Sequence, residues 1–338
     1  MTTIKDIARV AGVSVTTVSR ALNGYSDVNE KTRQKIAAVA KELNYSPNTL
    51  ARGLVMQKSK TIGLLVSGIS RESVKDNFTF EVLCGVNERA STLGYDLILF
   101  NTNTMMQREK TYTQLCRERR VDGAIIQGIK KEDPYLKEVV ESDIPCVLVD
   151  IPVHSNSVGY VTTDNALGAK KAVEHLASLG HQHIGMINGH EDAFVSQERL
   201  NGYREALKEC GLSFHSEWVV SGNFEEKKAE KAARELINRH KEVTAIFCAS
   251  DLMALGALKA CKELGLQVPK DISIVGYDNI VLASYSSPNL TTVGQEVYQI
   301  GYQAADLLIE MLEGKETNMK RYLDTKLIIR ESTAKNHN

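Results

Sequence analysis

Short hydroxylated side chains gather near the amino terminus beside one arginine: Ser14, Thr16, Thr17, Ser19 and Arg20. Hydroxyl groups suit phosphate oxygens and base edges, a guanidinium pairs with the O6 and N7 atoms of guanine, and the methyl groups of Val15 suit the thymine methyl. This pattern indicates a surface that reads the major groove of DNA. A small helical cap on a larger domain is the plainer alternative.

Two carboxylates, Asp251 and Asp278, each follow an apolar run that is typical of a buried strand. Ligands of parallel sheets bind beyond the carboxyl ends of the strands, so both carboxylates are candidate acceptors for ligand hydroxyls. The alternative is an acid at a helix amino terminus, which is plausible for Asp251 because it opens a helical pattern.

Sequence signatures of enzymes are missing from the chain. It has no G-x-S-x-G elbow, no phosphate-binding loop and no G-x-G-x-x-G after a strand. His181, His183 and His190 lack an evident third metal ligand, and no two of the six cysteines have C-x-x-C spacing. We therefore expect no catalytic residue, no metal and no cofactor, and we expect reduced thiols.

The first 60 residues contain no strand-like run, and apolar spacing predicts helical segments at 4–11, 15–22, 30–44 and 48–56. Gly12 can end the first segment, and Ser14 can cap the second. Pro47 ends the third because the residue before a proline avoids the helical region. A polar linker follows at 57–60. Two short helices joined by a tight turn describe a helix-turn-helix.

From residue 61 onward, apolar strands alternate with amphipathic helices. Strands are expected at 61–66, 95–100, 121–127, 146–149, 158–163, 183–187, 217–220, 244–248 and 272–276. Repeated strand–helix units predict an α/β fold with parallel sheets covered on both faces. So many strands suggest two lobes with a boundary near residues 150–160, and segment 291–328 is a strand-helix-strand that can cross between the lobes.

Charge divides the 338-residue chain unevenly. Residues 1–60 hold ten Lys+Arg against four Asp+Glu, a net of +6, whereas the remainder holds 31 against 38, a net of −7. A basic amino-terminal segment is attracted to a polyanion such as DNA. No apolar run approaches the roughly 20 residues of a membrane helix, and the polar amino terminus lacks a signal peptide. We expect a cytoplasmic protein.

The stretch TIKDIARVAGVSVTTVSRALN, at 3–23, resembles the DNA-binding signature of the LacI/GalR (lactose-repressor) family. NYSPN at 44–48 and ARGL at 51–54 continue the resemblance. Further motifs fall in family order: Gly123 in VDGAII, HLASLGH at 175–181, RLNGY at 199–203, SDLMALG at 250–256 and GYDN at 276–279. This resemblance implies a DNA-binding transcriptional regulator, and more specifically a repressor.

The resemblance assigns DNA contacts to individual residues. Val15, Thr16 and Arg20 would enter the major groove, while Ser14, Thr17, Asn23 and Tyr45 match positions that hold phosphates. Residues 48–55 would form a hinge helix, with Asn48 and Ala51 on it. Leu54 matches an apolar wedge that kinks the duplex from the minor groove.

The same resemblance implies a body similar to periplasmic sugar-binding proteins of the first type, with an effector between the lobes. The implied contacts are Phe78, Asp150, Asp164, Arg199, Phe224, Asp251 and Asp278. Asn77 leads directly to Phe78 here, where many relatives have Asn-Pro-Phe-Phe. A sugar or sugar derivative is the expected effector, with a purine, a nucleoside or a phosphoprotein partner as alternatives. A plain solute-binding protein or a sugar-processing enzyme is the alternative of a different class.

The expected domain limits are 1–46 for the DNA-binding domain, 47–60 for hinge and linker, and 61–338 for effector binding and dimerisation. Lobe 1 would take 61–160 and 291–322, and lobe 2 would take 161–290 and 323–338. We expect a homodimer on a pseudo-palindromic operator, joined through residues 79–93 and 251–284. A tetramer is not expected, because the polar tail after Ile329 has no leucine heptad.

Overall fold

The computed structural model describes residues 2–45, 58–67, 77–102, 110–129, 133–153, 155 and 157–336. The chain divides into two compact units, Met1–Lys60 and Thr61–Asn338. The predicted hinge helix, with Asn48, Ala51 and Leu54, lies outside the described residues.

In its described residues, the first unit contains the helices α1 (Ile4–Ala11), α2 (Val15–Leu22) and α3 (Glu30–Glu42). Gly12 ends α1 with a φ of 66°, a left-handed conformation that glycine adopts without strain. The helices enclose a core that includes the fully buried Ile7, Val18 and Ile36. The third helix is shorter than expected because Asn44, with a φ of 47°, has left the helical region.

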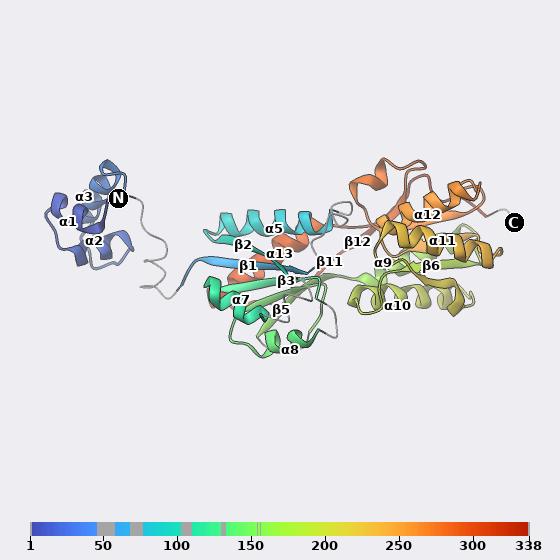
Figure 1. Cartoon of the computed structure of the whole chain (residues 1–338), viewed down its shortest axis with the longest axis horizontal. Coiled ribbons are helices and arrows are strands. Elements are labelled where there is room, and N and C mark those ends of the chain that lie inside the picture. The colour runs from blue at the N-terminus through green and yellow to red at the C-terminus, as the bar shows by residue number, and fades with distance from the viewer. Residues whose placement is uncertain are drawn as a thin grey trace. The chain divides into compact units, whose positions relative to one another are not determined.

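The second unit contains two six-stranded sheets. The first has the order β11-β5-β4-β3-β1-β2 and is parallel throughout. Its strands are β1 (Thr61–Ser67), β2 (Asp96–Thr102), β3 (Gly123–Gln127), β4 (Cys146–Val149), β5 (Val158–Thr163) and β11 (Lys320–Leu323). Its helices are α5 (Phe78–Thr92), α7 (Tyr112–Arg119), α8 (Pro134–Glu141) and α13 (Val297–Leu312). Helices α5 and α13 share one core cluster, and α7 and α8 cover the other face (Figure 1).

The second sheet has the order β12-β10-β9-β8-β6-β7. Its strands are β6 (Ile184–Asn188), β7 (Val219–Ser221), β8 (Ala245–Cys248), β9 (Ser273–Asp278), β10 (Thr291–Gln295) and β12 (Thr325–Ile328). Its helices are α9 (Asn165–Ser178), α10 (Phe194–Glu209), α11 (Glu226–Arg239) and α12 (Asp251–Glu263). Only β12 is antiparallel to its neighbour among the pairs described.

Three expected boundaries need correction. The expected lobe limits place residues 291–295 in the first lobe, but β10 pairs with β9 in the second sheet, with Thr291 opposite Val275. Strand β5 stays in the first sheet up to Thr163, beyond the expected boundary near 150–160. The strand expected at 217–220 begins only at Val219, because Ser216–Trp218 is a 3₁₀ helix. Pairing partners in the sheet, which apolar runs do not specify, set these limits.

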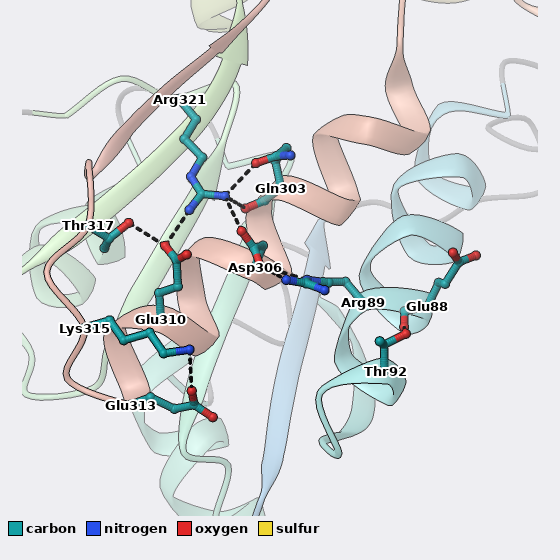
Figure 2. Close-up of polar contacts among 10 residues, drawn as sticks. All are labelled: Glu88, Arg89, Thr92, Gln303, Asp306, Glu310, Glu313, Lys315, Thr317 and Arg321. Carbon is teal, nitrogen blue, oxygen red and sulfur yellow. Dashed lines mark hydrogen bonds and ion pairs between the residues drawn. The ribbon is translucent and has the colours of Figure 1, made fainter.

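Strand β11 is held to the first lobe by an ion-pair network on α13. Figure 2 shows Asp306 between Arg89 of α5 and Arg321 of β11, with Nε of Arg89 and Nη1 of Arg321 each 2.8 Å from a carboxylate oxygen. Arg321 also reaches Glu310 at 2.6 Å. Although burial opposes it, these arginines lower the pKa of Asp306. The network fixes an edge strand that pairs only with β5.

In the part of the chain that the structure describes, no helix has the length and apolar character needed to cross a membrane.

Candidate DNA and effector sites

Helix α2 presents the hydroxylated residues that were singled out in the sequence. Ser14 caps the helix: its Oγ accepts a hydrogen bond from the Thr17 N–H at 3.0 Å and lies 2.8 Å from the Thr17 hydroxyl. Thr16 is exposed and Val15 is 37% exposed, whereas Val18 is buried in the core as expected. One face of α2 therefore packs and the opposite face remains open to a ligand.

Arg20 lies in the last turn of α2 and contacts the loop that follows. Its Nη2 is 2.6 Å from Oδ2 of Asp27, and its Cζ is 4.8 Å from the ring centre of Tyr25. Asn23 donates to the Ser19 hydroxyl at 3.4 Å. Tyr45 is half-buried against the helical core. The sequence pattern indicated Arg20, but it did not indicate its partners Tyr25 and Asp27.

Arg199 is the buried cation of the body. It is 3% exposed although it lies on α10, and its guanidinium stacks 3.7 Å above the ring centre of Tyr277. Its Nε donates to Oδ1 of Asn165 at 2.9 Å, and its Nη1 donates to the Ala249 carbonyl at 2.5 Å. Nη1 also lies 3.6 Å from Oδ1 of Asp278, so this carboxylate at the end of β9 forms an ion pair with it.

Polar side chains at the carboxyl ends of strands from both sheets join this ion pair. Gln295, at the end of β10, donates to Asp278 at 2.7 Å and accepts from the Thr163 hydroxyl of β5 at 3.0 Å. Asp150, which follows β4, accepts from Thr162 at 2.8 Å. Burial raises the pKa of Asp150, and the Thr162 hydrogen bond and the Arg199 charge oppose that shift.

Left-handed backbone marks the ends of these strands. Asp150 has a φ of 60° and Asp278 a φ of 107°, and both are non-glycine residues for which such values cost energy. Strain of this kind persists only where the surrounding structure imposes it, and it is concentrated at functional sites. The backbone conformation of Asp150 and Asp278 therefore supports a functional role for both carboxylates.

Two predicted ligand contacts, Asp251 and Asp164, have hydrogen-bond partners within the protein. Asp251 is fully buried at the start of α12, and its carboxylate accepts from the Ile280 N–H at 2.8 Å and from the Thr292 hydroxyl at 2.5 Å. Burial and the nearby charge of Asp278 raise its pKa well above the usual range. Asp164 caps α9 by accepting from the Leu167 N–H at 2.9 Å. Asp164 is therefore bonded as a helix cap, whereas Ser250 caps α12 and the bonds of Asp251 reach residues outside that helix.

The two predicted aromatic contacts occupy different places. Phe224 has a φ of 57° and is half-buried, and its ring packs edge-to-face on His190 at 5.6 Å. A Cβ atom on Gly189 would come within 2.1 Å of this ring, so a larger residue there would displace the ring. Phe78 begins α5 and packs against the core of the first lobe.

The residues that the sequence reasoning missed are the neutral partners Thr162, Thr163, Asn165 and Gln295. Each stands at a strand end or at the helix start that follows, so the rule used for Asp251 and Asp278 could have selected them. Asn165, at the start of α9, connects α10 with the end of β5, because it accepts from Arg199 and donates to the Thr163 carbonyl at 3.1 Å.

His181 is bonded to side chains of the second lobe. The two ring nitrogens of His181 lie 2.9 Å from the Thr244 hydroxyl and 3.0 Å from the Ser273 hydroxyl. Over the ranges that the structure describes, no three histidine, cysteine or acidic side chains are grouped to hold a metal ion.

A helix-turn-helix domain joined to a two-lobed α/β body defines a DNA-binding regulator with a ligand-binding body. Residues 3–48 match the model described as bacterial regulatory proteins of the lacI family, and residues 173–333 match that of a periplasmic-binding-protein-like domain. The chain is 36% identical to the HTH-type transcriptional repressor PurR of Vibrio vulnificus and 37% identical to that of Vibrio campbellii, over 99% of both chains in each case.

Solved structures agree with these matches. The lac repressor dimer bound to operator and the anti-inducer ONPF is 29% identical, with a TM-score of 0.85, over 98% of this chain and 99% of the other. The transcriptional regulator CelR in complex with cellobiose is 32% identical, with a TM-score of 0.76, over 98% of this chain and 100% of the other. The chain belongs to the LacI family. It is a DNA-binding transcriptional repressor and not an enzyme.

Proposed function

We propose that this repressor is controlled by a small molecule that binds where the carboxyl ends of the two sheets meet. The observation that carries the proposal is the hydrogen-bonded group of Asp278, Arg199 and Gln295, which continues through Thr163 into the first sheet. A ligand that changes the bonding of Asp278 changes a contact that joins both lobes. Asp150 is the proposed acceptor from the first lobe.

The chemistry of this group favours a ligand that is rich in hydrogen-bond donors. Arg199 is buried, and its Nε and Nη1 donate to Asn165 and Ala249, whereas Asp150 and Asp278 supply carboxylate oxygens, which accept hydrogen bonds. Sugar hydroxyls match carboxylate acceptors, and an aromatic ring such as Phe224 suits the apolar face of a sugar. We therefore propose a sugar or sugar derivative as the effector.

A purine or nucleoside is the second candidate. The 36% identity to the PurR repressors over nearly the whole chain favours it. The N–H groups of a base can also donate to Asp278, and its ring can stack on Phe224. A phosphoprotein co-repressor is the third possibility, and the screen below distinguishes the first two.

On the DNA side, α2 is the proposed recognition helix. Val15, Thr16 and Arg20 would enter the major groove, and Ser14, Thr17, Asn23 and Tyr45 would hold phosphates. Residues 47–60 are proposed as hinge and linker, with Asn48 and Ala51 on the hinge helix and Leu54 as its minor-groove wedge. The exposed face of α2 and the charge of +6 over residues 1–60 support this arrangement.

The test is an effector screen on the full chain. Thermal unfolding is followed with sugars, sugar phosphates, nucleosides and purine bases, because a ligand at 100 times its dissociation constant stabilises the fold by about 2.7 kcal/mol. A hit must then change operator affinity, and operator must change the affinity for the hit by the same factor. A screen in which none of these compounds shifts the transition would refute a small-molecule effector of these classes.

A further inference from the structure

The side chain of Arg20 is held from two sides by the loop between α2 and α3. The carboxylate of Asp27 approaches Nη2 at 2.6 Å, and the ring of Tyr25 lies 4.8 Å from Cζ. This loop is itself anchored. The Tyr25 N–H donates to the Arg20 carbonyl at 3.1 Å, and Arg33 donates to the Tyr25 carbonyl at 2.8 Å.

The contact with Asp27 leaves the guanidinium able to bind a base. A guanidinium has five N–H donors in a planar fork, and the closest approach of Asp27 is to one terminal nitrogen, Nη2. Because one carboxylate cannot accept from all five donors, a guanidinium can bind it and still donate to the O6 and N7 atoms of guanine. Both side chains keep access to solvent, at 45% for Arg20 and 53% for Asp27.

The charge of Asp27 argues against a role in general DNA affinity. Residues 1–60 contain only four acidic side chains, and Asp27 lies in the loop beside the last turn of the proposed recognition helix. A carboxylate there repels the phosphate backbone and weakens binding to any duplex. What it offers in return is a fixed orientation for Arg20, which reduces the rotamer entropy lost when the arginine docks on a base.

We infer that Asp27, assisted by Tyr25, is a specificity-determining positioning residue that directs Arg20 to a guanine edge. The inference rests on the proposed function, in which Arg20 contacts a base. A free arginine reaches phosphates of any sequence, whereas an arginine held by a carboxylate and an aromatic face has fewer orientations. Asp27 therefore acts on discrimination between sequences more than on affinity.

The test starts from the duplex that the full-length wild-type chain selects from a randomised library. Fluorescence anisotropy then measures affinity for that duplex, for versions with each G·C pair replaced, and for a random duplex. The variants are Arg20→Ala, Asp27→Asn, the double variant and Tyr25→Leu. Glu42→Gln is the control, because it removes the same charge from an exposed position on α3.

Arg20→Ala should reduce the preference for one base pair of the half-site by about five- to 150-fold. Asp27→Asn should reduce the preference for the same pair by about two- to fivefold, without weaker binding to the random duplex. The double variant should match Arg20→Ala alone, since Asp27 acts through Arg20. Tyr25→Leu should lose less than Asp27→Asn, and Glu42→Gln should keep the full preference.

The inference is overturned if Asp27→Asn keeps the wild-type preference, or if it binds the selected duplex more tightly with preference intact. The second result would make the ion pair a latch that competes with DNA. If the wild type selects no duplex, or Arg20→Ala changes no base preference, the proposed role of Arg20 fails and this inference fails with it.

Discussion

The carboxylate of Asp278 accepts a hydrogen bond from Gln295 at 2.7 Å and lies 3.6 Å from Nη1 of Arg199. The contact with the cation is longer than a hydrogen bond, and Asp278 is the carboxylate that we propose to accept from a ligand hydroxyl. Neutral residues of both sheets surround the pair, so a change at one side chain is felt by its partners on the other lobe.

Asp278→Asn should weaken effector binding, because a hydrogen bond to a charged acceptor contributes about 1.5–3 kcal/mol. That corresponds to about ten- to 150-fold in dissociation constant, measured by titration calorimetry with the compound found in the screen. Operator affinity without effector should stay within about twofold.

Asp164→Asn is the matched control, because it makes the same change at the helix cap of α9. Effector affinity near the wild-type value is expected for this variant. A loss as large as that of Asp278→Asn would indicate that Asp164 contacts the effector. Wild-type effector affinity in Asp278→Asn would show that Asp278 does not contact it.

Helix pairs of the body approach each other through glycine. A Cβ atom on Gly202 of α10 would lie 2.0 Å from the carbonyl oxygen of Ala166 in α9, far inside contact distance. Gly202→Ala should therefore force these helices apart and cost about 1–3 kcal/mol, the usual range for overpacking. Urea denaturation measures the change.

The neighbouring substitution Asn201→Ala tests whether the effect is local to the packed face, since Asn201 is exposed on the same helix. We expect a change within about 0.5 kcal/mol for it. Equal changes for the two variants would contradict the packing argument.

His181 ties the carboxyl-terminal tail to the second sheet, because its Nε2 lies 3.1 Å from the Ala334 carbonyl and 3.0 Å from the Ser273 hydroxyl. Burial lowers the pKa of His181 below the usual 6.5. The folded state then binds fewer protons than the unfolded state at pH values below about 6.5. Stability should be complete above that pH and fall as the pH decreases toward the lowered folded-state pKa.

Urea midpoints of wild type and His181→Asn at pH 7.5 and 5.5 measure this contribution. Part of the wild-type decrease should disappear in the variant, while His215→Asn, at a histidine whose side chain is 39% exposed, should retain it. The same decrease in all three chains would show that other groups cause the pH dependence.

Exposed apolar side chains on the body bear on how this chain assembles. Large apolar side chains are exposed around the 3₁₀ helix that follows β9, with Val281 at 62%, Leu282 at 43% and Tyr285 at 80%, and Phe80 of α5 is 59% exposed. Phe80, Val281 and Leu282 fall within the segments 79–93 and 251–284 that we expect to form the dimer, and Tyr285 directly follows the second segment. Exposed apolar side chains of this size are typical of protein–protein interfaces.

We expect sedimentation to show a homodimer at micromolar concentration. Leu282→Asp combined with Tyr285→Asp should yield monomers, since a carboxylate cannot be buried in the interface without a partner. Operator affinity of the monomeric variant should be lower than that of the wild type, because each half-site of a palindrome requires one recognition helix and a monomer supplies only one. A monomeric wild type with full operator affinity would contradict this assembly.

The amino-acid sequence determined much of the local structure. Apolar spacing placed all three described helices of the DNA-binding unit, and Gly12 and Ser14 marked the turn between α1 and α2. Alternating strands and helices predicted the parallel sheets. These features follow from the periods of helices and strands, which depend on neighbours a few residues apart.

Only the tertiary structure decided which distant residues meet. Arg199 by itself resembles a surface arginine, yet its burial against Tyr277 and its bond to Asn165 come from elements far apart in sequence. Residues 291–295 belong to the second lobe because β10 pairs with β9, and this pairing places Gln295 beside Asp278. Sequence periodicity specifies which face of an element is buried, whereas long-range pairing depends on the packing of all the elements together.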